Sequence, residues 1–308
     1  MLYLSETDVL RFLPMGDCVA LMRNVFRDMA DGIALNQPRR RLILPTRSVL
    51  HYMAGSDGGY FGAKVYSTNP GHRPHFLFLL YRAGDAKLLS VIEANHLGQI
   101  RTGAASGYAT SLLARPDSRT LAVIGSGFQA QTQVEAIRTA MPSIGRILVW
   151  SRSPENRESF AQACAAEVAE SVESAVRNAD IVVTATSSAE PVLEDSWIAP
   201  GTHLNAMGSN QARRRELPGD LVRRADLIVA DSVEQSWMES GDLLLALRDE
   251  DWDRVVELKD VAAGRSGRKR PEDITLFKSN GLAVEDVAAA AWVYERAQEA
   301  GAGRQLYS

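Results

Sequence analysis

The chain has 308 residues, enough for one large domain or two ordinary domains with a buried core. Its formal net charge of -4 argues against any general affinity for nucleic acid or for acidic membrane surfaces. The two cysteines, Cys18 and Cys164, lie far apart, and the five histidines are not spaced as ligands, so we expect neither a disulfide framework nor a metal site. No apolar run of about 18 residues and no leader-like start are present. We therefore expect a cytoplasmic protein without a membrane span.

The first third of the chain changes from helical to strand-like patterns. Residues 5–31 show apolar positions at helical spacing, with Ser5 as a capping residue and Asp8 three positions later. From 39 to 93, short strand-like runs alternate with turn residues, which predicts an antiparallel sheet. The predicted strands are Arg41–Leu44, Val49–Met53, Tyr60–Tyr66, Phe76–Tyr81 and Leu88–Glu93.

The second part of the chain has a different organisation. A helix rich in small residues is predicted over 94–114, and Arg115 to Ser118 resembles a domain boundary. Beyond it, short apolar strands alternate with helices, one of them predicted over Pro154–Val168, which indicates a parallel sheet covered on both faces. A last helix, Leu282–Ala300, is expected to pack back on the first domain. The fold class is thus α/β: a doubly wound parallel sheet over 117–281, plus an α+β domain with an antiparallel sheet formed by 1–116 and 282–308.

A glycine-rich motif opens the parallel part. The strand Leu121–Ile124 leads directly into Gly125-Ser126-Gly127-Phe128-Gln129-Ala130, which starts a helix. Gly125 permits the tight turn, Gly127 lets a pyrophosphate approach the backbone, and Ala130 allows close packing of helix on strand. Because the N–H groups of the helix start face the phosphates, this motif in this context predicts a Rossmann-type dinucleotide site.

The residues after the second parallel strand bear on the choice of cofactor. An NAD site usually has Asp or Glu there, whereas this chain has Ser151-Arg152-Ser153. Arg152 is suited to pair with a 2′-phosphate, and the two serines to donate to it. NADP is therefore favoured, with NAD as the alternative.

Two further strand ends are expected to border the nicotinamide, since ligands of doubly wound sheets bind outside the carboxyl ends of the strands. They carry Thr186 and Ser187 after one strand and Met207, Gly208, Ser209 and Asn210 after another.

Several cations precede the parallel domain. Lys64 lies in an otherwise apolar strand, Arg101 lies among small residues of a helix, and Arg39 and Arg40 follow Pro38. Converging cations without a metal cluster suit a small substrate that carries a carboxylate. A solvent-facing Lys64 is the alternative.

Seven stretches along the chain match the motifs of a known family in order and spacing. They are Gly62–Val65, Ile100–Ala105, Ile124–Ala130, Pro200–Gly208, Glu239–Asp242, Thr275–Ser279 and Gly281–Asp286. Through them the chain resembles the ornithine cyclodeaminase/mu-crystallin family along nearly its whole length. The resemblance implies that Arg40, Lys64 and Arg101 hold the carboxylate of an amino or imino acid, with Arg39 as an alternative to Arg40. It also implies a homodimer built through the antiparallel domain.

One position departs from the cyclodeaminase members of the family. Their loop after the Asn-Ala-x-Gly strand carries an aspartate, where this chain has Asn210, and an amide cannot shuttle a proton. With Arg152, this favours the ketimine reductase branch: an NAD(P)H-dependent reductase of cyclic imino acids such as Δ1-pyrroline-2-carboxylate or Δ1-piperideine-2-carboxylate. Lys64, or a water held by Asn210, would supply the proton. The alternatives are ornithine cyclodeaminase, alanine dehydrogenase, or a binding protein without turnover.

Overall fold

The computed structural model of the chain describes residues 1–306, which divide into two compact units. The first unit consists of Met1–Thr102 and of the chain from Gly281 onward, and the second is Gly103–Asn280. The first division falls inside a helix, fourteen residues before the boundary expected at 116, while the second falls within one residue of expectation. No helix among the described residues is both long enough and apolar enough to cross a membrane. The cytoplasmic location stays a prediction.

The first unit begins with two helices rather than one. α1 (Glu6–Phe12) has the predicted cap, since Ser5 accepts from the backbone N–H of Asp8 and Asp8 accepts from that of Ser5. α2 (Met15–Ala30) starts anew after Pro14, whose ring fits the first position of a helix but not its interior. Both helices belong to the sequence predicted as helical.

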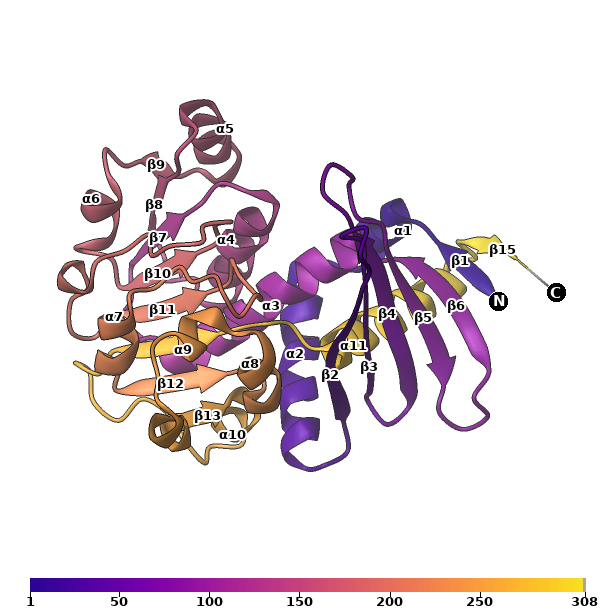
Figure 1. The fold of residues 1–308 in the computed structure, drawn as a ribbon. Helices are drawn as coiled ribbons and strands as arrows, with labels where there is room; N and C mark the ends of the chain where they lie inside the picture. Colours follow the sequence, from indigo (N-terminus) through magenta and orange to yellow (C-terminus); the bar gives the residue numbers. More distant parts are fainter. Residues whose placement is uncertain (307–308) are drawn as a thin grey trace. The chain divides into compact units, whose positions relative to one another are not determined.

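The first unit also contains a seven-stranded sheet (Figure 1). Its order is β15-β1-β6-β5-β4-β3-β2, and β2 to β6 pair as antiparallel neighbours, which confirms the predicted antiparallel sheet. β1, which was not predicted from the sequence, lies between β15 and β6 and pairs with β6 in parallel. The strands are β1 (Leu2–Leu4), β2 (Leu35–Ile43), β3 (Val49–Ser56), β4 (Tyr60–Thr68), β5 (Phe76–Arg82), β6 (Leu88–Glu93) and β15 (Arg304–Gln305).

The C-terminal helix α11 (Ala283–Glu299) packs on this sheet, as predicted. It contacts β2 to β5 and both N-terminal helices of the same unit. Its close approach depends on Gly55 of β3, where a Cβ would lie 2.7 Å from the backbone nitrogen of Val284. The face of the sheet that carries Gly55 is therefore filled by α11.

The second unit holds an eight-stranded sheet in which every pair is parallel (Figure 1). In the order β13-β12-β14-β11-β10-β7-β8-β9, the chain extends from β7 through β8 and β9 on one side and through β10 and β11 on the other, and β14 lies between β11 and β12; this is a doubly wound arrangement, as predicted. The strands are β7 (Thr120–Ile124), β8 (Arg146–Trp150), β9 (Glu167–Val168), β10 (Ile181–Thr184), β11 (His203–Ala206), β12 (Leu227–Ala230), β13 (Val255–Glu257) and β14 (Thr275–Lys278).

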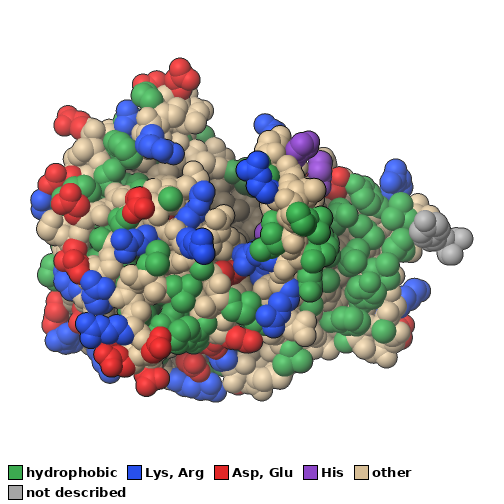
Figure 2. Space-filling view, viewed as in Figure 1, with side chains coloured by type: hydrophobic (Ala, Val, Ile, Leu, Met, Phe, Trp, Pro, Cys, Tyr) green, Lys and Arg blue, Asp and Glu red, His purple; other side chains and the backbone are tan. Residues whose placement is uncertain are grey.

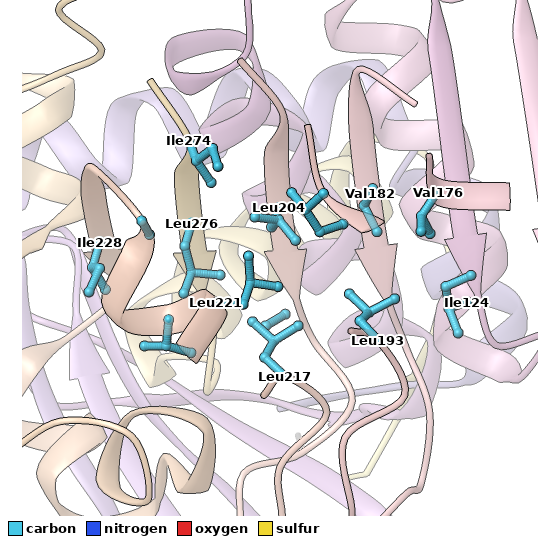
Figure 3. Packing of buried hydrophobic residues seen from close by; sticks show 14 of the residues in the cluster. Ile124, Val176, Val182, Leu193, Leu204, Leu217, Leu221, Ile228, Ile274 and Leu276 are labelled. Atoms are coloured by element: carbon cyan, nitrogen blue, oxygen red, sulfur yellow. The ribbon is translucent and has the colours of Figure 1, made fainter. Parts of the chain in front are cut away.

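Helices cover both faces of this sheet because successive strand residues point to opposite sides. In β7, Ala122 and Ile124 join one apolar cluster, while Leu121 and Val123 join another. Figure 3 shows the first of these clusters, where side chains from β10, β11, β12 and β14 meet those of α6 and α7. The helices are α3 (Asn95–Leu113), α4 (Phe128–Ala140), α5 (Pro154–Cys164), α6 (Val172–Val176), α7 (Gly219–Arg224), α8 (Val233–Glu239), α9 (Gly241–Leu244) and α10 (Leu258–Ala262), with short 3-10 turns at Asp195–Trp197 and Asp249–Arg254.

One predicted helix is wrong in its length. The sequence predicts a helix from Pro154 to Val168, but α5 ends at Cys164. Ala165 takes a left-handed conformation with φ of 51°, and Glu167–Val168 then pair with β8 as strand β9. The edge of the sheet provides hydrogen bonds that outweigh the helical preference of the intervening residues.

Candidate functional site

A pocket of about 620 Å³ lies at the carboxyl ends of β7, β8, β10 and β11 in the second unit. Of the fourteen residues predicted to bind the cofactor, twelve line it. They are Gly125, Ser126, Gly127, Phe128, Gln129, Ser151, Arg152, Ser153, Thr186, Ser187, Met207 and Gly208.

The remaining two predicted cofactor residues do not line the pocket. Ala130 is fully buried in the apolar cluster beneath α4, which is the packing role expected of it. Ser209 is buried beyond the pocket wall, where its carbonyl oxygen accepts from Nζ of Lys278 at 2.6 Å. Seven lining residues were not predicted, because no motif marks them: Ile124, Trp150, Asn156, Val172, Ala185, Ser188 and Val192.

The glycine-rich turn has the geometry that a bound pyrophosphate requires. Gly125 has φ of 117°, and a Cβ there would overlap the carbonyl oxygen of Ala185. Gly127 precedes the first residue of α4 and brings no side chain, and a Cβ at this position would meet no atom within 4 Å. The N-terminal end of α4 therefore opens on the pocket, where its N–H groups and dipole suit an anion.

At the end of β8, the serines are held by hydrogen bonds while Arg152 is exposed. Oγ of Ser126 donates to Oγ of Ser151 at 2.8 Å, which joins the glycine-rich turn to the loop after β8. Ser151 in turn donates to the carbonyl oxygen of Ser153, the residue that caps α5. Neither Asp nor Glu occurs among the residues that line the pocket.

A buried carboxylate fixes the strand ends on the other side of the pocket. Glu216 accepts from the backbone N–H groups of Thr186 and Gly208, both at 2.6 Å, and from Oγ1 of Thr184 at 3.0 Å. Burial raises the pKa of Glu216, and the neighbouring charge of Asp242 adds to this effect. Since Thr184, Thr186 and Gly208 all donate to it, the carboxylate joins the loop after β10 to the loop after β11. The sequence analysis did not predict a role for Glu216.

The first unit gathers buried charges on the α11 side of its sheet. Lys64 and Arg101 are 4% and 5% exposed, which excludes the alternative of a solvent-facing Lys64. Nζ of Lys64 lies 3.0 Å from Oδ1 of Asp286, and Arg101 reaches the same oxygen with Nε at 3.1 Å. Nη1 of Arg101 also contacts Oε2 of Glu285 at 2.6 Å. We call these residues, with Arg39, the buried charge cluster.

Burial and neighbouring charges set the protonation of this cluster in opposite directions. Burial lowers the pKa of Lys64 to about 8, although Asp286 partly restores it. Burial alone would lower the pKa of Arg101 and raise that of Asp286. Their mutual attraction outweighs both effects, so the pKa of Arg101 is raised and that of Asp286 is lowered. Lys64 is thus the member of the cluster suited to give up a proton near neutral pH.

The two neighbouring arginines of β2 lie in different environments. Arg39 is 4% exposed and donates to the carbonyl oxygen of Gly281 and to Sδ of Met53. Arg40 is exposed and pairs across the strands with Tyr52, on the sheet face away from α11. Successive strand residues point to opposite faces, and the bulge between Gln37 and Arg40 sets which of the two arginines faces α11. Arg39, the alternative that the sequence left open, is therefore the arginine of this pair that lies on the sheet face of Lys64.

Asn210 lies in the loop after β11 and is half-buried, and it is not among the residues that line the pocket. Among residues 1–306, no three side chains of His, Cys, Asp or Glu come together as metal ligands.

A doubly wound parallel sheet with a glycine-rich turn and a pocket at its carboxyl edge is the arrangement of a dinucleotide-binding domain. The model of the ornithine cyclodeaminase/mu-crystallin family matches residues 1–301, and the chain belongs to this family. The resemblance stated from the sequence is thereby confirmed.

Three relatives illustrate the similarity. A Δ1-pyrroline-2-carboxylate reductase of Bacillus cereus is 37% identical over 236 residues, which are 73% of this chain and 71% of that protein. Ketimine reductase mu-crystallin of Mus musculus is 39% identical over 228 residues, or 73% of this chain and 70% of that protein. The solved Δ1-pyrroline-2-carboxylate reductase of Thermococcus litoralis, in complex with NADH and L-proline, has a TM-score of 0.94 and 33% identity, covering 99% of this chain and 100% of that one.

Proposed function

We propose that this protein is a NAD(P)H-dependent reductase of cyclic imino acids, which converts Δ1-pyrroline-2-carboxylate or Δ1-piperideine-2-carboxylate to proline or pipecolate. The observation that carries the proposal is the buried charge cluster. Its three cations and two carboxylates leave one positive charge, which a single substrate carboxylate neutralises. The relatives that reduce cyclic imines support the same reaction.

The residues of the first unit bind and protonate the substrate in this proposal. Arg101 and Arg39 hold the carboxylate, and their fixed positions orient the C=N bond. Lys64 supplies the proton to the imine nitrogen, because a protonated imine accepts hydride more readily and a pKa near 8 suits proton transfer near neutral pH. A reduced nicotinamide, when bound, supplies the hydride.

We also propose that NADP is the preferred cofactor. The pocket contains Arg152 at the end of β8 and has no acidic lining residue that would hold the 2′-hydroxyl of NAD or repel a 2′-phosphate. In Arg152→Ala we expect the Kd for NADPH to rise by roughly 10- to 100-fold, and that for NADH to change little. Arg138→Ala, at an exposed arginine outside this pocket, is the control. Equal losses for both cofactors would exclude a 2′-phosphate contact.

The reaction itself is tested by following NADPH oxidation with five- and six-membered cyclic imino acids. In Arg101→Lys the positive charge beside Glu285 and Asp286 is kept but the planar fork is lost, so we expect KM for the imino acid to rise roughly tenfold or more. The Kd for NADPH should stay unchanged. Arg82→Lys, at an exposed arginine of the same unit, is the control. A normal KM in the Arg101 variant contradicts the assignment.

Assays with other substrates separate the alternative functions. Release of ammonia and proline from ornithine with NAD would identify a cyclodeaminase, and NADH formation from alanine would identify an alanine dehydrogenase. Tight NADPH binding with no turnover on any imino acid would identify a binding protein.

We further propose a homodimer closed through the outer face of the first unit's sheet. On the face opposite α11, Leu42, Leu50, Tyr52 and Leu77 are 55%, 39%, 47% and 40% exposed. Figure 2 shows hydrophobic side chains gathered over these strands. Apolar side chains from neighbouring strands of one face form a continuous patch, which a second copy would remove from water.

Replacement of Leu50 and Leu77 by Glu tests the dimer. By sedimentation we expect the native protein at twice its 33.6 kDa and the double variant at 33.6 kDa. Leu10→Glu, at an exposed apolar residue of α1, is the control and should leave the assembly intact. A native protein that sediments as a single chain excludes the proposal.

A further inference from the structure

Asp286, in the first turn of α11, is shared between two cations from different elements. Its Oδ1 lies 3.0 Å from Nζ of Lys64 on β4 and 3.1 Å from Nε of Arg101 on α3. The carboxylate has no exposed surface, and its Oδ2 is buried without a hydrogen-bond partner. Both cations contact the same oxygen, so the charge of this carboxylate is compensated through Oδ1 alone. Its position therefore calls for a role beyond packing.

The first turn of α11 is anchored so that Asp286 has little freedom to move. Oδ1 of Asn36, on β2, accepts from the backbone N–H groups of Ala283 and Val284 at 2.8 and 3.3 Å. These N–H groups start the helix, so the asparagine acts as its cap from a distant strand. Gly55 makes the close approach of this turn to β3 possible.

Two glycines leave room for the cations beside Asp286. A Cβ at Gly98 would overlap Nζ of Lys64, and a Cβ at Gly281 would lie 2.6 Å from Nη1 of Arg101. Gly281 also has φ of 80°, a conformation that favours glycine. The surrounding backbone is thus shaped around the two cations in the positions that Asp286 sets.

The other titratable, charged and aromatic groups around Lys64 and its partners come from five elements: α2, α3, α11, β2 and β5. Arg101 of α3 and Arg39 of β2 disfavour its charged form, whereas Asp286 favours it. Glu285 contacts Arg101 but is not among the main influences on Lys64. Cys18 of α2 lies near the cluster as a neutral thiol, because burial and then Glu285 raise its pKa. The ring of Phe76, on β5, is 5.4 Å from Nζ of Lys64. Asp286 is the nearest group that favours the charged lysine.

We infer that Asp286 is a positioning residue for imino acid reduction: it holds Lys64 and Arg101 in place and keeps Lys64 protonated where the imine needs its proton. This inference rests on the proposed role of Lys64 as the proton source. Asp286 does not touch the substrate and acts through the two cations.

The test measures the titration of Lys64 directly, without turnover. The chain has five lysines, so a sample labelled with ¹³C at lysine Cε gives five resonances, and that of Lys64 is absent from Lys64→Met. In Asp286→Asn we expect the midpoint of Lys64 to move to lower pH by roughly one to three units. Glu285→Gln is the matched control, since it makes the same change of charge one residue away, and we expect a smaller shift. Equal shifts in both variants, or none in Asp286→Asn, overturn the inference.

A second arm separates the inference from the proposed function. In the native protein, kcat for imino acid reduction should fall as pH rises through about 8, the pKa of Lys64, and in Asp286→Asn this fall should begin at lower pH. Asp286→Glu keeps the charge and should restore most of the native profile. A shifted resonance with an unshifted rate profile means that Lys64 is not the proton source, while its control by Asp286 stands.

Should Asp286→Asn fail to fold, the pairing of Asp286 with Lys64 is tested instead by the stability of the double variant Asp286→Asn/Lys64→Met. It removes the cation that the single variant leaves unbalanced, so it should unfold at a higher urea concentration than Asp286→Asn or fold where the single variant does not. A double variant less stable than Asp286→Asn contradicts the pairing.

Discussion

Glu216→Gln tests whether one carboxylate holds the pocket together. The native side chain has no exposed surface, and its two oxygens accept from Thr186, Gly208 and Thr184. Glutamine has nearly the same shape, but one oxygen becomes an NH₂ group. This group must then face either the N–H of Thr186 or the donors of Gly208 and Thr184, so at least one buried donor loses its acceptor.

The size of the effect follows from these contacts. A buried donor left without an acceptor costs about 1–3 kcal/mol, and loss of the acceptor's charge weakens the remaining bonds by about 1 kcal/mol. Relief of repulsion with Asp242 offsets part of this, so we expect the free energy of unfolding to fall by about 2–3 kcal/mol. For a unit the size of Gly103–Asn280, this corresponds to a Tm lower by roughly 4–12 °C.

Thermal unfolding followed by circular dichroism measures the stability, and nicotinamide fluorescence measures the Kd for NADPH. Because Thr186 and Gly208 line the pocket, we expect the Kd to rise roughly tenfold. The exposed Glu170 provides the control variant Glu170→Gln, which should match the native protein in both measurements. A native Tm and Kd in Glu216→Gln would refute the view that this carboxylate fixes the strand ends.

Three further variants probe the second unit. Gly125→Ala forces a Cβ onto the carbonyl oxygen of Ala185 at a positive φ, so it should weaken NADPH binding at least roughly tenfold by fluorescence titration; unchanged affinity would show that the turn adapts. Leu276→Ala should lower the free energy of urea unfolding by about 2–5 kcal/mol, and a loss below 1 kcal/mol would mean that the cluster closes over the cavity. Burial holds the pKa of His203 at about 3 against an ordinary 6.5, so between these pH values the unfolded chain binds a proton that the folded chain does not. The free energy of unfolding therefore falls as pH falls through this window. In His203→Gln this loss should be smaller by up to about 4–5 kcal/mol. An equal loss in the variant and the native protein, measured by urea unfolding across the window, would count against this.

Much of the nucleotide pocket could be predicted from the sequence because its signals are local. The turn Gly125–Ala130 follows a strand and starts a helix within a few residues, and the tight turn and close approach depend only on those residues. The strand ends at Thr186 and Met207 followed from the alternation of apolar strands. Each feature is encoded within about ten residues, where periodicity and turn chemistry are informative.

The partners of the buried charges could not be predicted in this way. Lys64 and Asp286 are 222 positions apart, and Glu216 contacts strand ends about 30 positions earlier in the chain. A pattern of single residues shows a cation in an apolar strand, but it does not show which carboxylate neutralises it. That pairing is set by the packing of α11 on the sheet.

The bulge in β2 has a consequence for how related chains are compared. Adjacent strand residues point to opposite faces, and the extra residue decides that Arg39 takes the face of Lys64 while Arg40 takes the other. A residue-by-residue alignment that ignores the extra residue would match the wrong arginine to its counterpart in a relative. Superposing the backbones through β3, whose register with β4 is uninterrupted, avoids this error. Insertions or deletions near Pro38 in other members should therefore be assigned by which arginine contacts Met53, and not by the count from the preceding helix.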